Sequence, residues 1–198
     1  MSYFHTTHLH RHHLICSLEQ SASTVVFDMD DTLIYTSYAN FIAYKMALYE
    51  NMGLSLEHTP HERFTKEHLQ KKFQDTLLES DFTHIISSKN SLFEACISYT
   101  MLNYPLVTLL KKYAKSDKQV ILLTNSNRTR AIQLLKHYKL YHLFDKVIVN
   151  PKSHPNKYET LKRHTPLLNQ EILLFENEDK EIDNALCVGI DRDRIVKI

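Results

Sequence analysis

The sequence predicts an α/β fold with a mainly parallel sheet, helices on both sheet faces and an inserted all-helical segment. Three observations predict it: a short apolar run at 24–27 followed by acid, helical periodicity alone over 37–103, and alternating strand-like and helical segments from 104 onward. Such alternation is typical of parallel sheets, whose strands are joined by crossover helices. The chain of 198 residues is long enough for one such core with a small inserted module.

We expect the first strand at Thr-Val-Val-Phe, residues 24–27, because a short β-branched run is typical of a strand buried on both faces. Apolar residues then recur at helical spacing up to Met52, where Gly53 would end the helix. Pro60 would open a second helix, and a third would cover 82–97. The aromatic residues of this segment are expected to be its core.

The remaining elements follow in alternation. Strands are predicted at 119–123, 146–149, 172–175 and 194–198, and helices at 106–113, 127–138, 155–164 and from the fourth strand to about 188. The expected organisation is a leader at 1–21, a core domain made of 22–36 and 104–198, and a helical domain at 37–103.

Composition excludes several classes of protein. The net charge is +1 with scattered Lys and Arg, which argues against a nucleic-acid groove. No apolar run is long enough to span a bilayer and the polar start is unlike a signal peptide, so a cytoplasmic protein is expected. Gly53 and Gly189 are the only glycines, which disfavours glycine-rich nucleotide-binding loops. The His-rich leader and Cys16, Cys96 and Cys187 show no metal-ligand spacing.

Polar side chains follow each of the first four strands of the predicted sheet. They are Asp28 and Asp30 after the first strand, Thr124 and Asn125 after the second, Lys152 after the third, and Glu176 and Asn177 after the fourth. Because the carboxyl ends of parallel strands meet at one edge of a sheet, we expect these groups to converge there.

Phosphoryl transfer uses this combination of groups. A phosphomonoester carries about −1.5 to −2 charges near neutral pH, so an attacking carboxylate needs Mg²⁺ and a lysine to offset the repulsion. Asp28 would attack phosphorus and form an aspartyl-phosphate. Asp30 would protonate the leaving oxygen and then activate water.

The same residues resemble the motifs of the haloacid-dehalogenase superfamily. Phe27-Asp28-Met29-Asp30-Asp31-Thr32-Leu33 resembles its first motif, Thr124-Asn125 its second, Lys152 its third and Glu176-Asn177 its fourth. The order and spacing agree from about residue 22 to the end. The resemblance implies a Rossmann-like core, a type-one cap at 37–103 that closes over the site, and Mg²⁺ as cofactor. It implies Thr124, Asn125 and Lys152 as phosphate-binding residues and Asp28, Asp30, Glu176 and Asn177 as metal ligands.

Two positions leave alternatives open. Asn177 stands where many relatives have Asp, and Asp179, with Asp183 as its partner, is the alternative metal ligand. For the phosphate-binding lysine, Lys152 is preferred and Lys157, in the first turn of the following helix, is the alternative.

The predicted function is Mg²⁺-dependent hydrolysis of a phosphomonoester, with a small phosphorylated molecule or a phosphoprotein as substrate. Asp30 argues against a dehalogenase, which does not need that proton relay. A phosphosugar mutase would share every motif and is one alternative. A catalytically weak binding or regulatory protein is another, and Asn177 is the feature in its favour.

Overall fold

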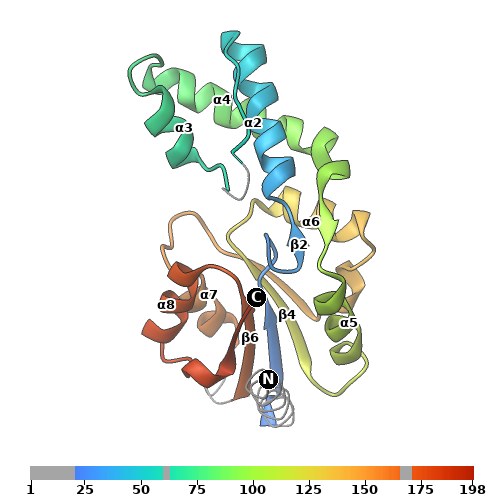
Figure 1. The fold of residues 1–198 in the computed structure, drawn as a ribbon. Helices are drawn as coiled ribbons and strands as arrows, with labels where there is room; N and C mark the ends of the chain where they lie inside the picture. The colour runs from blue at the N-terminus through green and yellow to red at the C-terminus, as the bar shows by residue number, and fades with distance from the viewer. Residues whose placement is uncertain (1–20, 60–62, 166–170) are drawn as a thin grey trace, which may run out of the picture.

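The computed structural model describes residues 21–59, 63–165 and 171–198 and confirms the predicted α/β class (Figure 1). Its main sheet has five parallel strands in the order β5-β4-β1-β6-β7. The strands are β1 (Thr24–Phe27), β4 (Gln119–Thr124), β5 (Lys146–Val149), β6 (Ile172–Glu176) and β7 (Ile195–Lys197). Strand order reverses at β1, because β4 and β5 lie on one side of it and β6 and β7 on the other. Ligands of parallel sheets gather beyond the carboxyl ends of strands at such a reversal.

Helices cover both faces of the sheet, and the two faces have separate apolar cores. They are α5 (Tyr104–Tyr113), α6 (Arg128–His137), α7 (Lys157–His164) and α8 (Asp179–Cys187), with α5 and α6 drawn on one side and α7 and α8 on the other (Figure 1). Within β1, Val25 and Phe27 pack in one core and Val26 in the other. Side chains therefore alternate between two buried faces, which explains the unbroken apolar run of this strand.

The described residues 37–59 and 63–99 form a helical insert that stands beyond the carboxyl edge of the sheet (Figure 1). It contains α2 (Ser37–Met52), α3 (Lys66–Phe73), α4 (Glu79–Leu92) and the 3-10 helix η1 (Phe93–Tyr99). Phe41, Tyr44, Leu48 and Phe82 belong to an apolar cluster of the insert. The helices thus have a core of their own, as the aromatic periodicity predicted. The division into a core domain and a cap domain stays a prediction.

Several predicted boundaries were wrong. The second helix begins at Lys66, where Thr65 and His68 cap each other's backbone, and the predicted start at Pro60 lies outside the described residues. The third ends as a 3-10 helix, and α7 begins at Lys157 instead of Pro155. A two-stranded antiparallel sheet, β2 (Ile34–Tyr35) with β3 (Met101–Leu102), was not predicted because two residues carry too little periodicity.

Two further 3-10 turns, η2 (Tyr141–Leu143) and η4 (Arg192–Arg194), complete the elements. Nearly all of the predicted leader, including its histidines, lies outside the described residues. Over the ranges that the structure describes, none of the helices combines the length and apolar character needed to cross a membrane.

Candidate active site

The loop after β1 is a tight turn that places two acids, Asp28 and Asp30, side by side at the sheet edge. Both carboxylates are buried. The backbone N–H groups of Leu33 and Ile34 donate to the Met29 carbonyl, both at 3.0 Å, and thereby close the turn. Asp31 adopts φ 59°, a left-handed conformation that Asp tolerates better than most residues.

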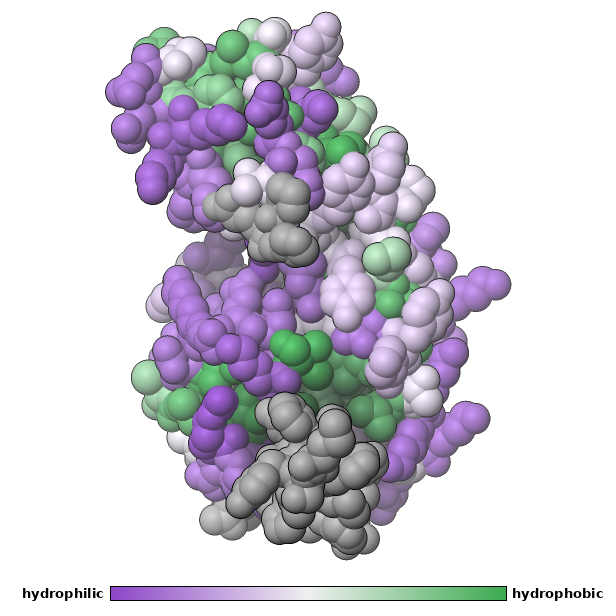
Figure 2. All heavy atoms as spheres, in the orientation of Figure 1, coloured by the Kyte–Doolittle hydropathy of each residue, from purple (hydrophilic) through white to green (hydrophobic). Residues whose placement is uncertain are grey.

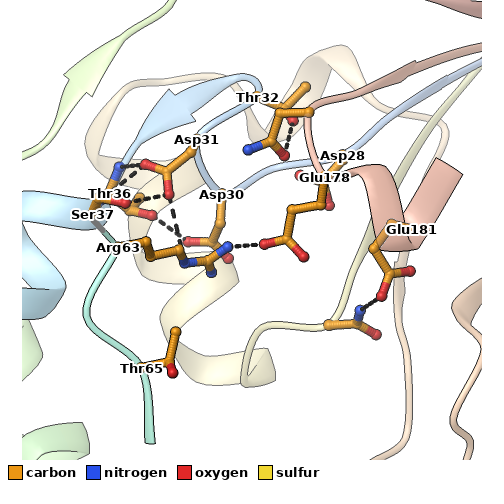
Figure 3. A network of polar contacts seen from close by, with 12 residues as sticks. Asp28, Asp30, Asp31, Thr32, Thr36, Ser37, Arg63, Thr65, Glu178 and Glu181 are labelled. Atoms are coloured by element: carbon orange, nitrogen blue, oxygen red, sulfur yellow. Dashed lines mark hydrogen bonds and ion pairs between the residues drawn. The ribbon is translucent and has the colours of Figure 1, made fainter. Parts of the chain in front are cut away.

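Asp31 has a structural task in this loop. Its carboxylate accepts from the backbone N–H of Thr36 at 2.8 Å and of Ser37 at 2.9 Å, and from the Ser37 hydroxyl at 2.5 Å. These are donors at the start of α2 that no helical carbonyl can satisfy. The third acid of the motif therefore ties the catalytic loop to the first helix of the insert (Figure 3).

Lys157 joins Asp28 to Glu176 at the centre of the site. Its Nζ lies 2.6 Å from Asp28 Oδ1 and 2.7 Å from Glu176 Oε2, and all three side chains are buried. The register of β1 against β6 pairs Phe27 with Phe175, so the acids next in sequence, Asp28 and Glu176, are neighbours. Burial raises the pKa of Asp28 to about 7, although Lys157 opposes this rise. The same two carboxylates raise the pKa of Lys157 above its usual range against the effect of burial.

Lys152 does not reach this site: it is exposed and does not line the cavity that contains Asp28. Asn156 caps α7 by accepting from the Tyr158 N–H at 2.9 Å, which makes Lys157 the first helical residue. Side chains in a helix lean toward its N-terminus, here toward the carboxyl edge of the sheet. The structure therefore places the alternative lysine, Lys157, beside Asp28, and the preference for Lys152 is corrected on this geometry.

Thr124, the last residue of β4, and Asn125, the first residue after it, line the cavity. Thr124 is buried and its hydroxyl accepts from the Ser126 N–H at 3.0 Å. The Asn125 amide donates to Glu181 Oε1 at 3.2 Å and accepts from the Asn150 side chain at 3.0 Å. The residue after β5 that contacts the site is thus Asn150, through Asn125, and not the predicted Lys152.

Asp30 is held as a carboxylate by four neighbours. Its Oδ1 accepts from the Thr36 hydroxyl at 2.7 Å and forms an ion pair with Arg130 of α6, and its Oδ2 accepts from the Ser126 hydroxyl at 2.6 Å. Burial by itself would raise the pKa of Asp30, but Arg130, the more distant Arg63 and the two hydroxyls lower it below its usual range. Arg130 also stacks on Phe93 of the insert, with its guanidinium carbon 4.1 Å from the ring centroid.

Arg63 reaches the site from the insert. It pairs with Glu178, which follows β6, and its Nε lies 3.6 Å from Asp31 Oδ2 (Figure 3). The guanidinium thus bridges the loops that follow β1 and β6 across the mouth of the site. Figure 2 shows a recess between the helical insert and the sheet domain, with hydrophilic side chains gathered beside it.

The converging residues enclose a cavity of about 210 Å³. It is lined by the acids Asp28, Asp30, Glu176, Glu178 and Glu181, the bases Arg63 and Lys157, and the neutral Thr65, Thr124 and Asn125. Acids outnumber bases, and Glu181 Oε2 is a buried carboxylate oxygen without a hydrogen-bond partner. A buried carboxylate oxygen without a partner is unfavourable unless a cation compensates it. These observations fit a divalent cation with oxygen ligands.

The predicted metal ligands are not equally free to bind a cation. In the described part of the chain, no three His, Cys, Asp or Glu side chains form a metal-binding group. Glu176 uses Oε2 for Lys157 and the Tyr158 hydroxyl, and Oε1 for two backbone N–H groups. Asn177 does not itself line the cavity, and its Oδ1 accepts from the hydroxyl of Thr32, in the loop after β1, at 2.9 Å. Mg²⁺ commonly keeps several waters, so Asp28 with neutral oxygens such as that of Asn177 is a suitable donor set.

The alternative acids after β6 lie outside the cavity. Asp179 is exposed and pairs with Lys197 at 2.5 Å, and Asp183 is also exposed. Sequence reasoning missed Glu181, Arg63 and Arg130. The position of Glu181 was a usable signal, because it lies in the first turn of α8, which begins close to the end of β6. Arg63 and Arg130 had no local signal, since their partners are far away in the sequence.

Known proteins share this fold. A family model described as haloacid dehalogenase-like hydrolase matches residues 22–177. Comparison with curated proteins finds no match. Solved structures do match. A predicted phosphoglycolate phosphatase from Haemophilus somnus 129PT has a TM-score of 0.72 and 16% identity, covering 85% of this chain and 83% of that one.

Two other structures illustrate the range of these neighbours. CbbY from Rhodobacter sphaeroides, solved in complex with phosphate, has a TM-score of 0.68 and 16% identity and covers 85% of this chain and 84% of its own. A β-phosphoglucomutase from Clostridium difficile has a TM-score of 0.65 and 16% identity, with 85% and 82% coverage. At such identity the likeness shows the fold alone. The family model spans most of the chain and includes all four strand ends of the site, and this protein belongs to the haloacid dehalogenase-like hydrolases.

Proposed function

We propose that this protein is a Mg²⁺-dependent phosphohydrolase that cleaves a phosphomonoester through an aspartyl-phosphate on Asp28. The observation that carries the proposal is the buried contact of Asp28 with Lys157, in a cavity that also contains Thr124, Asn125 and the partly unpaired Glu181. Hydrolase family membership and neighbours described as phosphatases support the reaction type.

In the first step a carboxylate oxygen of Asp28 forms a bond to phosphorus while the bond to the leaving oxygen breaks. Lys157, with Thr124 and Asn125, would bind the phosphoryl oxygens as their charge shifts. A magnesium ion held by Asp28 and Asn177, with Glu181 nearby, would offset the repulsion between the nucleophile and the phosphate.

In the second step water attacks the aspartyl-phosphate, free phosphate leaves and Asp28 is regenerated. Asp30 suits this step because Arg130, Ser126 and Thr36 hold it as a carboxylate that can accept the proton of water. Protonation of the leaving oxygen in the first step requires Asp30 to carry a proton and loosen its pair with Arg130. Substrates with acidic leaving groups, such as aryl phosphates, need little protonation and are therefore the first to assay.

The test is hydrolysis of p-nitrophenyl phosphate with Mg²⁺ and with excess chelator. We expect turnover that requires the metal and is lost in Asp28→Asn, whereas Asp183→Asn, which changes an exposed acid outside the cavity, is unaffected. Labelled substrate should leave phosphate on the wild-type protein and none on Asp28→Asn. Turnover that persists in Asp28→Asn would refute the assignment of the nucleophile.

Two alternatives have specific observations in their favour. A mutase has the β-phosphoglucomutase neighbour, and it would return a labelled phosphoryl group to a sugar instead of releasing phosphate. Two observations favour a weakly catalytic binding protein. Asn177 is neutral where many relatives have an acid, and both carboxylate oxygens of Asp30 already have partners in Thr36, Ser126 and Arg130. Absence of turnover in the assay above, with wild type and Asp28→Asn alike, would support it.

A further inference from the structure

The helical insert contributes two described residues to the cavity lining, Arg63 and Thr65. Arg63 lies in the segment between α2 and α3, and its guanidinium points into the space between Asp31 and Glu178 (Figure 3). Each pair joins the insert to one core loop, Asp31 after β1 and Glu178 after β6. The insert therefore places a positive charge over a site whose own phosphate-binding cation, Lys157, lies at the sheet edge.

The position of Asp30 relates Arg63 to one part of the substrate. Under the proposed function, Asp30 acts on the leaving oxygen, so the leaving group must lie beside its carboxylate. Arg63 and Asp30 line the same cavity, and Figure 3 shows the Arg63 guanidinium next to the Asp30 carboxylate. The phosphoryl group, by contrast, belongs beside Asp28 and Lys157 on the core side. Arg63 is thus placed to meet the leaving group.

The carboxylates that now neutralise Arg63 resemble the group it would bind. Glu178 and Asp31 each present a carboxylate to the guanidinium, and the Arg63 and Glu178 side chains are 36% and 42% exposed. Ion pairs at such exposure contribute little to stability, because water and salt screen them. A substrate carboxylate could replace Glu178 at little cost, and an arginine binds such a group through two parallel hydrogen bonds.

We propose that Arg63 determines specificity by binding a carboxylate on the leaving group, so that the preferred substrate is a small phosphorylated hydroxy acid. This inference rests on the proposed function. Thr65 supplies a hydroxyl on the same side of the cavity. The cavity of about 210 Å³ holds roughly seven waters and favours a leaving group of few carbons.

The probes are 3-phosphoglycerate and glycerol 3-phosphate, which differ only in a carboxylate against a hydroxymethyl group. We expect wild-type kcat/KM to be roughly 10- to 100-fold higher for 3-phosphoglycerate, the range of a charge-assisted hydrogen bond. Arg63→Gln should bring the ratio of kcat/KM for 3-phosphoglycerate to kcat/KM for glycerol 3-phosphate near one, chiefly because KM for 3-phosphoglycerate rises. Arg63→Lys should keep part of the ratio. Arg128→Gln, which removes an exposed arginine that lines neither this cavity nor its rim, should keep all of it.

Glu178→Gln separates recognition from a structural role. If Glu178 competes with the substrate for Arg63, its neutralisation should lower KM for 3-phosphoglycerate and leave KM for glycerol 3-phosphate unchanged. If Arg63 serves only to hold the insert on the core, the same change weakens that contact and impairs both substrates alike. The second result would overturn the inference.

Turnover of p-nitrophenyl phosphate separates this inference from the proposed function. Metal-dependent turnover of the aryl phosphate together with a wild-type ratio near or below one, or with no hydrolysis of either probe, overturns the role of Arg63 and leaves the proposed function standing. No turnover of the aryl phosphate or of either probe overturns both. A ratio of tenfold or more that survives Arg63→Gln also overturns the role of Arg63.

Discussion

Lys157 Nζ lies 2.6 Å from Asp28 Oδ1, although 129 positions separate the two residues in the chain. The pair is almost fully buried and shares Glu176 as a second acid. Burying the charges of Lys157, Asp28 and Glu176 costs solvation free energy. The attraction between the lysine and the two carboxylates offsets that cost only while all three charges are present. The lysine consequently supports both the fold and the charge balance around Asp28.

Lys157→Met should therefore lower activity and stability together. We expect a loss of roughly 10²- to 10³-fold in kcat/KM for p-nitrophenyl phosphate, because a preorganised positive charge is removed from the phosphoryl group. Unfolding in urea should show a loss of about 3–5 kcal/mol, since Asp28 and Glu176 lose their buried counter-charge. Lys152→Met is the matched control and should change stability by no more than about 0.5 kcal/mol. A larger activity loss in Lys152→Met than in Lys157→Met would reverse the assignment of the two lysines.

Asn177→Asp should strengthen magnesium binding. The variant adds a negative charge next to the catalytic loop and keeps an oxygen that can accept from Thr32. Calorimetric titration with MgCl₂ should show a Kd lower by roughly tenfold, a modest Coulombic gain at an effective dielectric near 20. Asp179→Asn serves as the comparison and should leave Kd unchanged, because Asp179 is exposed and paired with Lys197. A Kd that responds to Asp179→Asn and not to Asn177→Asp would move the ligand to Asp179.

Glu181→Gln should stabilise the metal-free protein and weaken metal binding. The buried oxygen of Glu181 that lacks a partner loses its charge in this variant. We expect the metal-free protein to gain about 1 kcal/mol on unfolding and the Kd for Mg²⁺ to rise. The exposed Glu159→Gln on α7 is the control and should alter neither quantity. Loss of stability in metal-free Glu181→Gln would show that the carboxylate is satisfied without a cation.

Lys89 of α4 should make the stability of the folded protein depend on pH. It is buried between aromatic rings, with Nζ 5.0 Å from the Tyr44 centroid and 5.8 Å from that of Phe93. Burial, reinforced by Arg130 and Arg63, lowers its pKa to about 7, while Asp30 and Cys96 act in the opposite direction. The unfolded chain holds this proton up to about pH 10.4. The folded state is therefore penalised fully below pH 7 and recovers stability as pH rises from 7 toward 10.4.

Lys89→Met removes the penalty and fills the same space. Below pH 7 the variant should be more stable than wild type by on the order of 1–3 kcal/mol, and the difference should shrink as pH rises above 7. Urea unfolding at pH 6 and pH 9 measures both values. Lys112→Met, at an exposed position on α5, is the control for the loss of a lysine. A difference that grows with pH would contradict the lowered pKa of Lys89.

The sequence predicted the parts of the site that follow strands directly. Asp28, Thr124 and Glu176 were recognisable because each ends a buried apolar run, and strand ends of a parallel sheet share an edge. Lys157 was harder to choose over Lys152, since the answer depends on which residue caps α7. That cap, Asn156, fixes the start of the helix and with it the lysine that turns toward the sheet.

Other parts of the site depend on tertiary packing. Arg130 is 100 residues from its partner Asp30, and Arg63 is 115 from Glu178. Neither arginine differs locally from one that faces solvent. The short β2–β3 pair likewise exists because two distant segments run side by side, with Ile34 opposite Leu102. Periodicity along a single segment contains no information about such partners.

The β2–β3 pair has a consequence for how such a protein can diversify. The chain leaves the sheet domain at β2 and returns at β3, so both crossings lie in one antiparallel ladder, and Asn103 fastens the return by donating to the Thr32 carbonyl at 2.9 Å. Excising everything between these strands would leave two ends already adjacent, which a short loop could join at small entropic cost. A different helical module could be grafted at the same junction, which would exchange the residues that face the cavity from the insert and leave those at the strand ends of the core unchanged.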